Sequence, residues 1–189
     1  MRDRFASVEH PAVVYITGRR GSGKSFTACE LINEWHELDP EGGRVHAIDP
    51  VGADDASVPG YLNHYADSWS RGVPDELPAG VSLLVVDEAD GVIGVRADQQ
   101  SPELVDLVRR GRHRGVTLAL CTQRPVLLMR DAWALADVVI AHRITDKRDL
   151  DRLAELPDAD ELAREAPELD VGEALVWTPE ETRRVSADD

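Results

Sequence analysis

A glycine-rich segment near the N-terminus has the spacing of a phosphate-binding loop. The eight residues GRRGSGKS, numbered 18–25, fit the pattern G-x-x-x-x-G-K-[ST] at every fixed position. Glycines let the backbone turn so that its N–H groups converge on phosphate oxygens, and a helix starting here adds the partial positive charge of its N-terminus. We therefore expect Lys24 to reach the β- and γ-phosphates of a nucleoside triphosphate and Ser25 to ligate Mg²⁺. The residues predicted to bind the nucleotide are Gly18, Arg19, Arg20, Gly21, Ser22, Gly23, Lys24, Ser25 and Phe26.

Two acids that end an apolar run, in the segment LLVVDEAD (83–90), supply the second half of such a site. A carboxylate at the C-terminal end of a buried parallel strand lies beside a phosphate loop, so Asp87 is predicted to hold Mg²⁺ through water. Glu88 follows directly, in the place of a general base that orients or deprotonates the attacking water. The alternative is that Glu88 is a solvated loop residue. An adjacent Asp-Glu pair favours a hydrolysing motor over a kinase, whose acceptor is another molecule.

A polar pair closes the apolar run LALCTQRP (118–125). Thr122 and Gln123 stand where a side chain senses the γ-phosphate or positions water, and Gln123 is the predicted sensor. The alternative is a strand-end amide whose hydrogen bonds are satisfied by a loop.

Four arginines lie within six residues of the segment VRRGRHRG (108–115). Positive charge at a helix end complements the helix dipole, but four arginines exceed what capping needs. Two functional interpretations compete with that one: an arginine finger inserted into a neighbouring subunit's nucleotide site, and contacts to nucleic-acid phosphates. The candidates for the finger are Arg109, Arg112 and Arg114.

Strands alternating with helices are expected to position these residues. Apolar, often β-branched runs predict strands at 12–17, 44–50, 81–90, 115–125 and 137–144, with a last strand at the sheet edge at 173–179. Apolar residues at helical spacing predict a helix at 25–38. Ser101 as cap and Pro102 at the first helical position predict another helix, to about Arg112. A short acidic helix is expected at 149–155, and a short helix or strand around 62–69. The alternation predicts an α/β fold with a largely parallel central sheet flanked by helices.

The composition is that of a globular protein with one core. At 189 residues, 42% of them apolar and 30% charged, the chain is expected to form a single domain spanning 1–189. Its core is expected at about 12–178, followed by a short acidic C-terminal tail. No run approaches the roughly 18 apolar residues of a membrane span. Cys29 and Cys121 lie inside apolar runs and are expected to be buried, reduced thiols of a cytoplasmic protein.

The charge is uneven along the chain. A formal net charge of −15 argues against a protein that coats nucleic acid with its whole surface. Residues 96–130 nevertheless hold seven arginines against three acids, whereas residues 146–189 hold fifteen acids against six bases. Any contact with nucleic acid is therefore expected at a restricted, arginine-rich surface.

Together these segments resemble the HerA/FtsK superfamily, which are DNA-pumping ATPases that include the packaging motors of double-stranded DNA viruses. The likeness covers residues 13 to about 178, and the phrase from Arg109 to Pro125 is the most diagnostic part. The chain is similar to the compact packaging ATPases of membrane-containing icosahedral viruses, because it shows neither the N-terminal barrel of cellular HerA relatives nor the membrane spans and winged-helix module of cellular FtsK. The matching segments are GRRGSGKS, HAIDP with Asp49-Pro50, LLVVDEAD, RRGRHRGVTLALCTQRP and ADVVIAHRITDKRDLDRL.

The resemblance implies a RecA-like core of the ASCE class that assembles as a ring, usually a hexamer. Hydrolysis of ATP with Mg²⁺ at subunit interfaces would pull a DNA duplex through the central pore. The resemblance carries over the roles of Lys24, Ser25, Asp87, Glu88 and Gln123, and it leaves the finger open among the three arginines. The expected pore segments are 91–100, where Arg96 or its neighbours would track DNA phosphates non-specifically, and the loop within 52–80. A capsid vertex protein would be a further partner, in the host-cell cytoplasm or on the virion.

Two rival hypotheses belong to other functional classes. One is an ATP-dependent phage assembly or secretion factor that resembles the zonula occludens toxin-like proteins, which characteristically carry a membrane helix. The other is a nucleotide-switched ATPase of DNA partition or conjugation. Partition ATPases usually show a second lysine early in the phosphate loop, where this chain has Arg19 and Arg20.

Overall fold

The computed structural model describes residues 10–38, 43–49 and 61–186. Its centre is an eight-stranded sheet with the strand order β3-β2-β4-β5-β1-β6-β7-β8. The first six strands in that order run parallel, and β7 and β8 are antiparallel additions at one edge. The strands are β1 Val13–Thr17, β2 Arg44–Ile48, β3 Ser68–Ser70, β4 Val81–Val86, β5 Thr117–Thr122, β6 Val138–Ala141, β7 Glu173–Trp177 and β8 Thr182–Ser186. The predicted largely parallel α/β sheet is confirmed.

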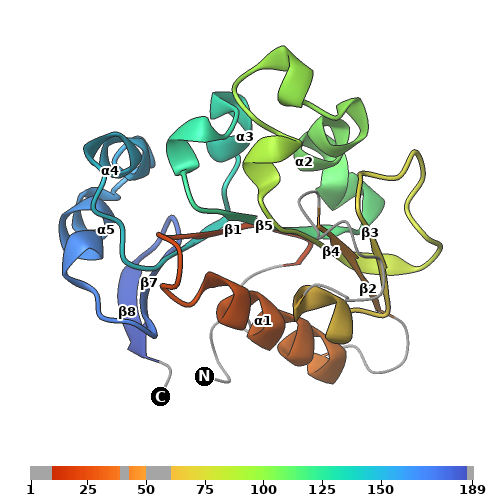
Figure 1. Ribbon diagram of the computed structural model, residues 1–189, viewed down its shortest axis with the longest axis horizontal. Helices are drawn as coiled ribbons and strands as arrows, with labels where there is room; N and C mark the ends of the chain where they lie inside the picture. Colours follow the sequence, from red (N-terminus) through yellow and green to blue (C-terminus); the bar gives the residue numbers. More distant parts are fainter. Residues whose placement is uncertain (1–9, 39–42, 50–60, 187–189) are drawn as a thin grey trace.

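Helices cover both faces of the sheet (Figure 1). The helix α1 (Lys24–Leu38) packs on one face, where its apolar side meets alternate residues of the central strands. The other face is covered by α2 (Pro102–Arg114), α3 (Arg130–Trp133), α4 (Lys147–Leu153) and α5 (Asp160–Glu165). Short 3-10 turns complete the chain: η1 Tyr61–His64, η2 Ala89–Gly91, η3 Ala97–Gln99, η4 Pro125–Leu127 and η5 Ala166–Glu168.

The strand order decides where polar side chains meet. β5 lies between β1 and β4, so the strand before the phosphate loop and the strand before Asp87 are not neighbours. All three strands are parallel, and their C-terminal ends therefore lie at one edge of the sheet. We call this row of C-terminal strand ends the nucleotide edge, and the row of N-terminal strand ends opposite it the arginine edge. Neither term refers to the outermost strands of the sheet.

The ends of α2 confirm the signals seen in the sequence. The Ser101 hydroxyl accepts the N–H of Leu104 at 3.3 Å, and Pro102 occupies the first turn. The helix stops at Gly115, whose φ of 71° is left-handed and favours glycine.

The C-terminal part corrects the sequence-based prediction. β7 is not the last strand, because β8 pairs with it in antiparallel register and forms the sheet edge in its place. Residues 182–186 therefore belong to the sheet and not to an acidic tail. β8 escaped prediction because its residues are exposed or half-buried and show no apolar run. The helices α3 and α5 were not predicted either, whereas both alternatives offered for 62–69 occur, as η1 and β3. Pro50 and residues 52–60 of the expected pore loop lie outside the described residues.

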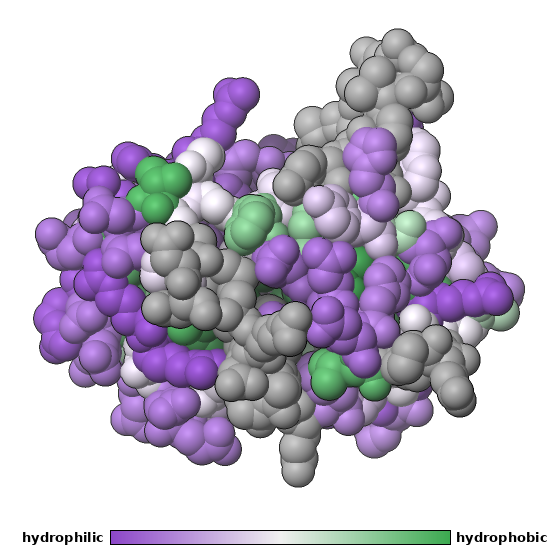
Figure 2. Space-filling model, turned by 90° about the horizontal axis from the view of Figure 1, so that it is seen from below, coloured by the Kyte–Doolittle hydropathy of each residue, from purple (hydrophilic) through white to green (hydrophobic). Residues whose placement is uncertain are grey.

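Both cysteines are buried and free, as predicted. Burial raises the pKa of the Cys29 thiol to about 12, so the thiol stays protonated. No helix among the described residues is long and apolar enough to cross a lipid bilayer. The face seen from below is largely hydrophilic, and the hydrophobic side chains visible on it are separate from one another (Figure 2).

Candidate active site

The phosphate loop joins β1 to α1 at the nucleotide edge, and its glycines pack against His142. Gly18 and Gly23 have φ values of 148° and 118°, which only glycine adopts readily. A Cβ atom at Gly18 would lie 2.7 Å from the His142 Cβ, and one at Gly23 would lie 3.1 Å from its Cε1. The fixed glycines are thus required for the close approach of the loop to this histidine as well as for the turn.

The His142 side chain is fully enclosed and fixed by two hydrogen bonds. Its Nδ1 lies 2.8 Å from the carbonyl oxygen of Glu173, and since a carbonyl only accepts, Nδ1 carries the proton. In the neutral ring Nε2 then accepts from the Thr27 hydroxyl in α1, at 2.9 Å. The imidazole therefore ties β6 and β7 to the helix that follows the phosphate loop. No local sequence pattern indicated a role for His142.

Lys24 points back over the loop. Its Nζ donates to the carbonyl oxygen of Arg19 at 3.1 Å, and the residue is only 9% exposed. Burial lowers the pKa of Lys24, and the nearby carboxylates of Glu88 and Asp87 oppose that shift. A bound triphosphate would oppose it further, because its negative charge stabilises the ammonium ion. Two hydroxyls of the same region, those of Thr17 and Ser22, are buried without a hydrogen-bond partner among the described residues, as expected of a cradle for a polar ligand.

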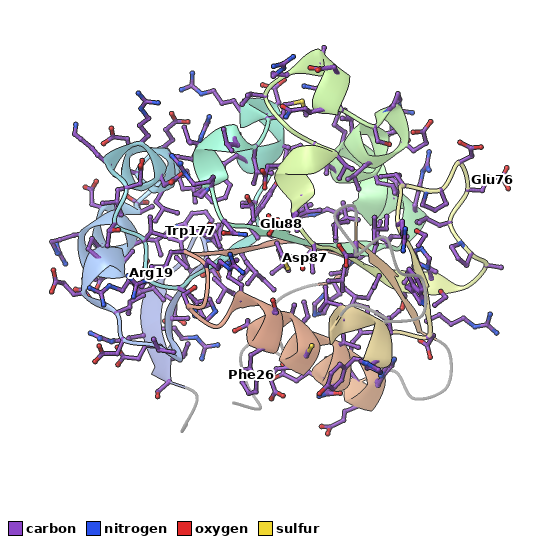
Figure 3. The ribbon with its side chains drawn as sticks, viewed as in Figure 1. Arg19, Phe26, Glu76, Asp87, Glu88 and Trp177 are labelled. Carbon is purple, nitrogen blue, oxygen red and sulfur yellow. The ribbon has the colours of Figure 1, made fainter. Side chains whose placement is uncertain are left out.

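Asp87 and Glu88 follow β4 directly and lie close together (Figure 3). The charges of both act on Lys24. Burial raises the pKa of the Asp87 carboxyl, and the charges of Glu88 and Asp49 add to the shift, while the Glu88 N–H at 3.0 Å and Lys24 oppose it. Glu88 has a left-handed backbone, with φ 44° and ψ 48°. This uncommon conformation for a residue with a side chain marks a sharp turn at the strand end.

Gln123 and Glu88 follow the neighbouring strands β5 and β4, and their side chains are in contact. The Gln123 Nε2 donates to the Glu88 Oε1 at 2.5 Å, and both side chains are half-buried. The predicted base and the predicted sensor are thus in direct contact, although 35 residues separate them. The structure brings Lys24, Asp87, Glu88 and Gln123 to one place.

Comparisons with known proteins bear on the fold of the chain. No family model matches the chain, and no curated protein matches it by sequence. Among solved structures, the genome packaging NTPase B204 from Sulfolobus turreted icosahedral virus 2, in complex with AMPPCP, matches with a TM-score of 0.67 at 16% identity, over 93% of this chain and 98% of that one. The N-terminal domain of zonular occludens toxin from Neisseria meningitidis matches with a TM-score of 0.55 at 17% identity, over 93% of both chains. The fold is that of a P-loop NTPase.

This P-loop NTPase fold is the one that the resemblance to the HerA/FtsK superfamily implies. The DNA-packaging ATPase B204 from Sulfolobus Turreted Icosahedral Virus gives a TM-score of 0.69 at 18% identity, over 92% of this chain and 96% of that one. At identities this low, the structural likeness shows the fold alone.

The site has oxygen donors suited to Mg²⁺. Ser25 is exposed in the first turn of α1, and the Asp87 carboxylate interacts electrostatically with Lys24, the residue before Ser25. Magnesium prefers oxygen ligands and keeps several waters while it binds the phosphates of a nucleotide, so a hydroxyl and one carboxylate suffice. The residues therefore fit the ion, and Ser25 and Asp87 are the ones that would hold it.

Two of the finger candidates, Arg112 and Arg114, lie at the arginine edge, and Arg109 lies further back along α2. Arg112 pairs with Asp137, which directly precedes β6 and whose other oxygen accepts the N–H of Val13, the first residue of β1, at 2.8 Å. Arg114 pairs with Asp106 at 2.5 Å and Arg109 with Asp131 at 3.8 Å. Strands of five to six residues separate the two edges by about 17–20 Å. Arg112 and Arg114 therefore cannot reach the phosphate loop of their own chain.

Other predicted residues also stand apart from the cluster. Phe26 is 46% exposed and lies on the far side of α1 from Asp87 and Glu88 (Figure 3). Arg19 and Arg20 are exposed at the tip of the loop. Arg96, in the expected pore segment, is exposed and pairs with Asp98 at 2.9 Å.

Arg124, directly after the sensor, braces the sensor loop against α4. Its Nε donates to the buried Asp149 carboxylate at 2.6 Å, and the other Asp149 oxygen accepts the N–H of Val126 at 3.1 Å. Thr122, on the other side of Gln123, donates to Asp90 at 2.7 Å. The sequence analysis named the Thr-Gln-Arg-Pro phrase but did not assign these contacts.

Proposed function

We propose that this chain is an ATP-hydrolysing DNA translocase that works as a ring and packages double-stranded DNA into a viral capsid. The observation that carries the proposal is the separation of the two edges. A chain with a nucleotide cradle at one end and the candidate fingers Arg112 and Arg114 at the other has half an active site at each end. Contacts of one end with the opposite end of the next chain are head-to-tail, and such contacts close into a ring when the rotation permits.

In this proposal each residue at the nucleotide edge has one task. The loop N–H groups and Lys24 bind the β- and γ-phosphates. Ser25 and Asp87 would hold Mg²⁺, which would neutralise negative charge there. Glu88 accepts a proton from the attacking water, and Gln123 fixes the direction of the Glu88 carboxylate. An arginine of the neighbouring subunit completes the site by stabilising the charge that develops on the transferred phosphoryl group.

The DNA-translocating part of the proposal rests on the arginine-rich region and on the fold neighbours. Packaging is named for two of the solved structures with this fold, over nearly their full length. Contacts of arginine with DNA phosphates are independent of sequence, as a motor that moves along DNA requires. The ring is expected to be a hexamer. It needs positive charge only on its inner surface, so a net charge of −15 is compatible with it. A capsid vertex protein is the partner expected to dock the ring in the host cytoplasm.

The test is ATP hydrolysis by the purified chain with and without double-stranded DNA, together with native mass and displacement of a DNA-bound probe. We expect hydrolysis that rises with DNA, displacement that depends on ATP, and loss of both in Lys24→Ala. Hydrolysis that DNA leaves unchanged, in an assembled ring, refutes the translocase. It favours instead an assembly or secretion ATPase, the class to which the zonular occludens toxin fold neighbour points.

A further inference from the structure

A groove on the side of the molecule away from the phosphate loop runs between α2 and the loop 73–80. It encloses about 530 Å³. Its floor is apolar, with Val73, Leu77 and Leu107 among the lining residues. Acidic side chains stand on both walls, Asp75 and Glu76 from the loop and Glu103 from the first turn of α2.

These three acids have no cationic partner among the described residues. Glu103 accepts a hydrogen bond from the Ser101 hydroxyl at 2.8 Å, which leaves its charge unneutralised. Asp106, deeper in the groove, differs because it pairs with Arg110 at 2.9 Å and with Arg114 at 2.5 Å. The groove therefore carries an excess of negative charge over an apolar floor, which is the chemistry that receives the long, part-apolar side chain of an arginine.

The unpaired cations that match this groove lie at the other end of the molecule. Arg19 and Arg20 are exposed at the tip of the phosphate loop, without an ion pair in the part of the chain that the structure describes. Space around the tip is open, since a Cβ at Gly21 would meet nothing within 4 Å. The loop backbone is nevertheless held, because the Arg19 N–H donates to the Arg143 carbonyl at 3.0 Å and the Ser22 N–H to the Arg19 carbonyl at 3.2 Å. Figure 3 shows Arg19 and Glu76 at opposite ends of the view, so they cannot meet within one chain.

We infer that the groove is the docking site for the phosphate-loop tip of the neighbouring subunit, with Arg19 and Arg20 as its occupants. The inference rests on the proposed head-to-tail ring. Arg114, one of the finger candidates, itself lines the groove. A neighbour placed so that Arg114 approaches its nucleotide therefore brings its loop tip to the acidic walls.

Docking of this kind couples assembly to the nucleotide. The loop that cradles the phosphates is then also an interface element, and charge complementarity fixes the register in which one subunit meets the next. The acids of the groove and the two arginines of the loop tip carry opposite charge, which favours contact of a groove with a loop tip over contact between two grooves or two loop tips. Salt is expected to weaken the contact, because the rim is exposed.

The test is a charge exchange, followed by sedimentation at low salt with Mg²⁺ and a non-hydrolysable ATP analogue. Glu76→Arg and Arg20→Glu each place like charges at the contact, and we expect each to weaken assembly about tenfold or more. Either the double variant or an equimolar mixture of the two single variants restores opposite charges, and assembly is expected to return. Glu180→Arg reverses an exposed acid in the turn between β7 and β8 and serves as the matched control.

Each outcome decides. If Glu76→Arg assembles like the wild type, or if neither the double variant nor the mixture recovers, the docking is wrong even where the wild type forms rings and hydrolyses ATP. A wild-type chain that stays monomeric under all conditions overturns both the docking and the proposed function. Binding of a fluorescent ATP analogue to dilute Glu76→Arg shows whether the variant is folded, and we expect wild-type affinity.

Discussion

Replacing His142 by alanine is expected to make the phosphate loop less ordered, although none of the residues predicted to bind the nucleotide is replaced. The imidazole makes a buried hydrogen bond to Thr27 and a part-buried one to the Glu173 carbonyl, and it packs against Gly18 and Gly23. Leaving a buried donor or acceptor unsatisfied costs about 1–3 kcal/mol. With two such groups and a cavity under the loop, we expect the free energy of unfolding to fall by about 3–5 kcal/mol.

The same change is expected to weaken ATP binding. Ordering one residue that has lost its support costs about 1–2 kcal/mol of conformational entropy, which corresponds to a loss of affinity of about 5- to 30-fold. Urea unfolding gives the first quantity and titration with a fluorescent ATP analogue gives the second. Thr27→Val removes only one of the hydrogen bonds and is expected to have the smaller effect on both. His113→Ala, at an exposed histidine of α2, is the matched control.

One result would refute this account of the loop. If His142→Ala unfolds at the wild-type urea concentration and binds the analogue with wild-type affinity, the loop does not depend on support from β6. A double-mutant cycle with Thr27→Val gives a sharper measure, because two directly bonded partners must show a coupling energy of at least about 0.5 kcal/mol.

Three further predictions concern the nucleotide edge. Glu88→Gln is expected to bind ATP normally and to hydrolyse it about 10²–10⁴-fold more slowly in single-turnover assays, and retained hydrolysis would exclude Glu88 as the base. Because burial raises the pKa of Asp87, the folded chain holds that proton to a higher pH than the unfolded chain, and stability falls as the pH rises through the folded pKa. Asp87→Asn is therefore expected to melt at a higher temperature than the wild type at pH 7 without nucleotide, and to lose its response to Mg²⁺. The difference in melting temperature is expected to vanish below pH 3.8, the ordinary pKa of an aspartate. An unchanged or lower melting temperature at pH 7 would contradict this. Gly18→Ala is expected to lower the free energy of unfolding by about 1–3 kcal/mol and to abolish ATP binding, because the new Cβ would meet His142. Gly21→Ala, where a Cβ meets nothing within 4 Å, is the mild control. Equal losses of stability in the two variants would contradict the close approach of the loop to His142.

The parts of the site that are encoded locally were predicted from the sequence. The phosphate loop is one contiguous turn whose glycines and lysine are fixed by their spacing, and Asp87 and Glu88 are recognisable because they end a fully apolar strand. Gln123 was predicted by the same argument. Its contact with Glu88 needed the strand order, because β4 and β5 are neighbours only in the folded sheet.

The remaining features depend on pairing between distant segments. His142 sits 115 residues from Thr27, and its place under the loop follows from the register of β6 against β1, which pairs Ala141 with Thr17. No local pattern distinguishes such a histidine from any other in an apolar run. The sequence likewise indicated a helix end rich in arginine, but only the topology shows that this end lies at the arginine edge. β8 was missed because an exposed edge strand has little apolar periodicity to detect.

The central claim is that the active site is completed across a subunit boundary, and mixing two inactive variants tests it most directly. Lys24→Ala lacks a working phosphate loop but keeps its arginines, and a chain in which Arg109, Arg112 and Arg114 are all replaced by alanine has the reverse defect. Each variant alone is expected to be inactive. The account predicts that ATP hydrolysis returns when the two are mixed, because some interfaces then join an intact loop to intact arginines. A mixture that forms rings and stays as inactive as its components would contradict it.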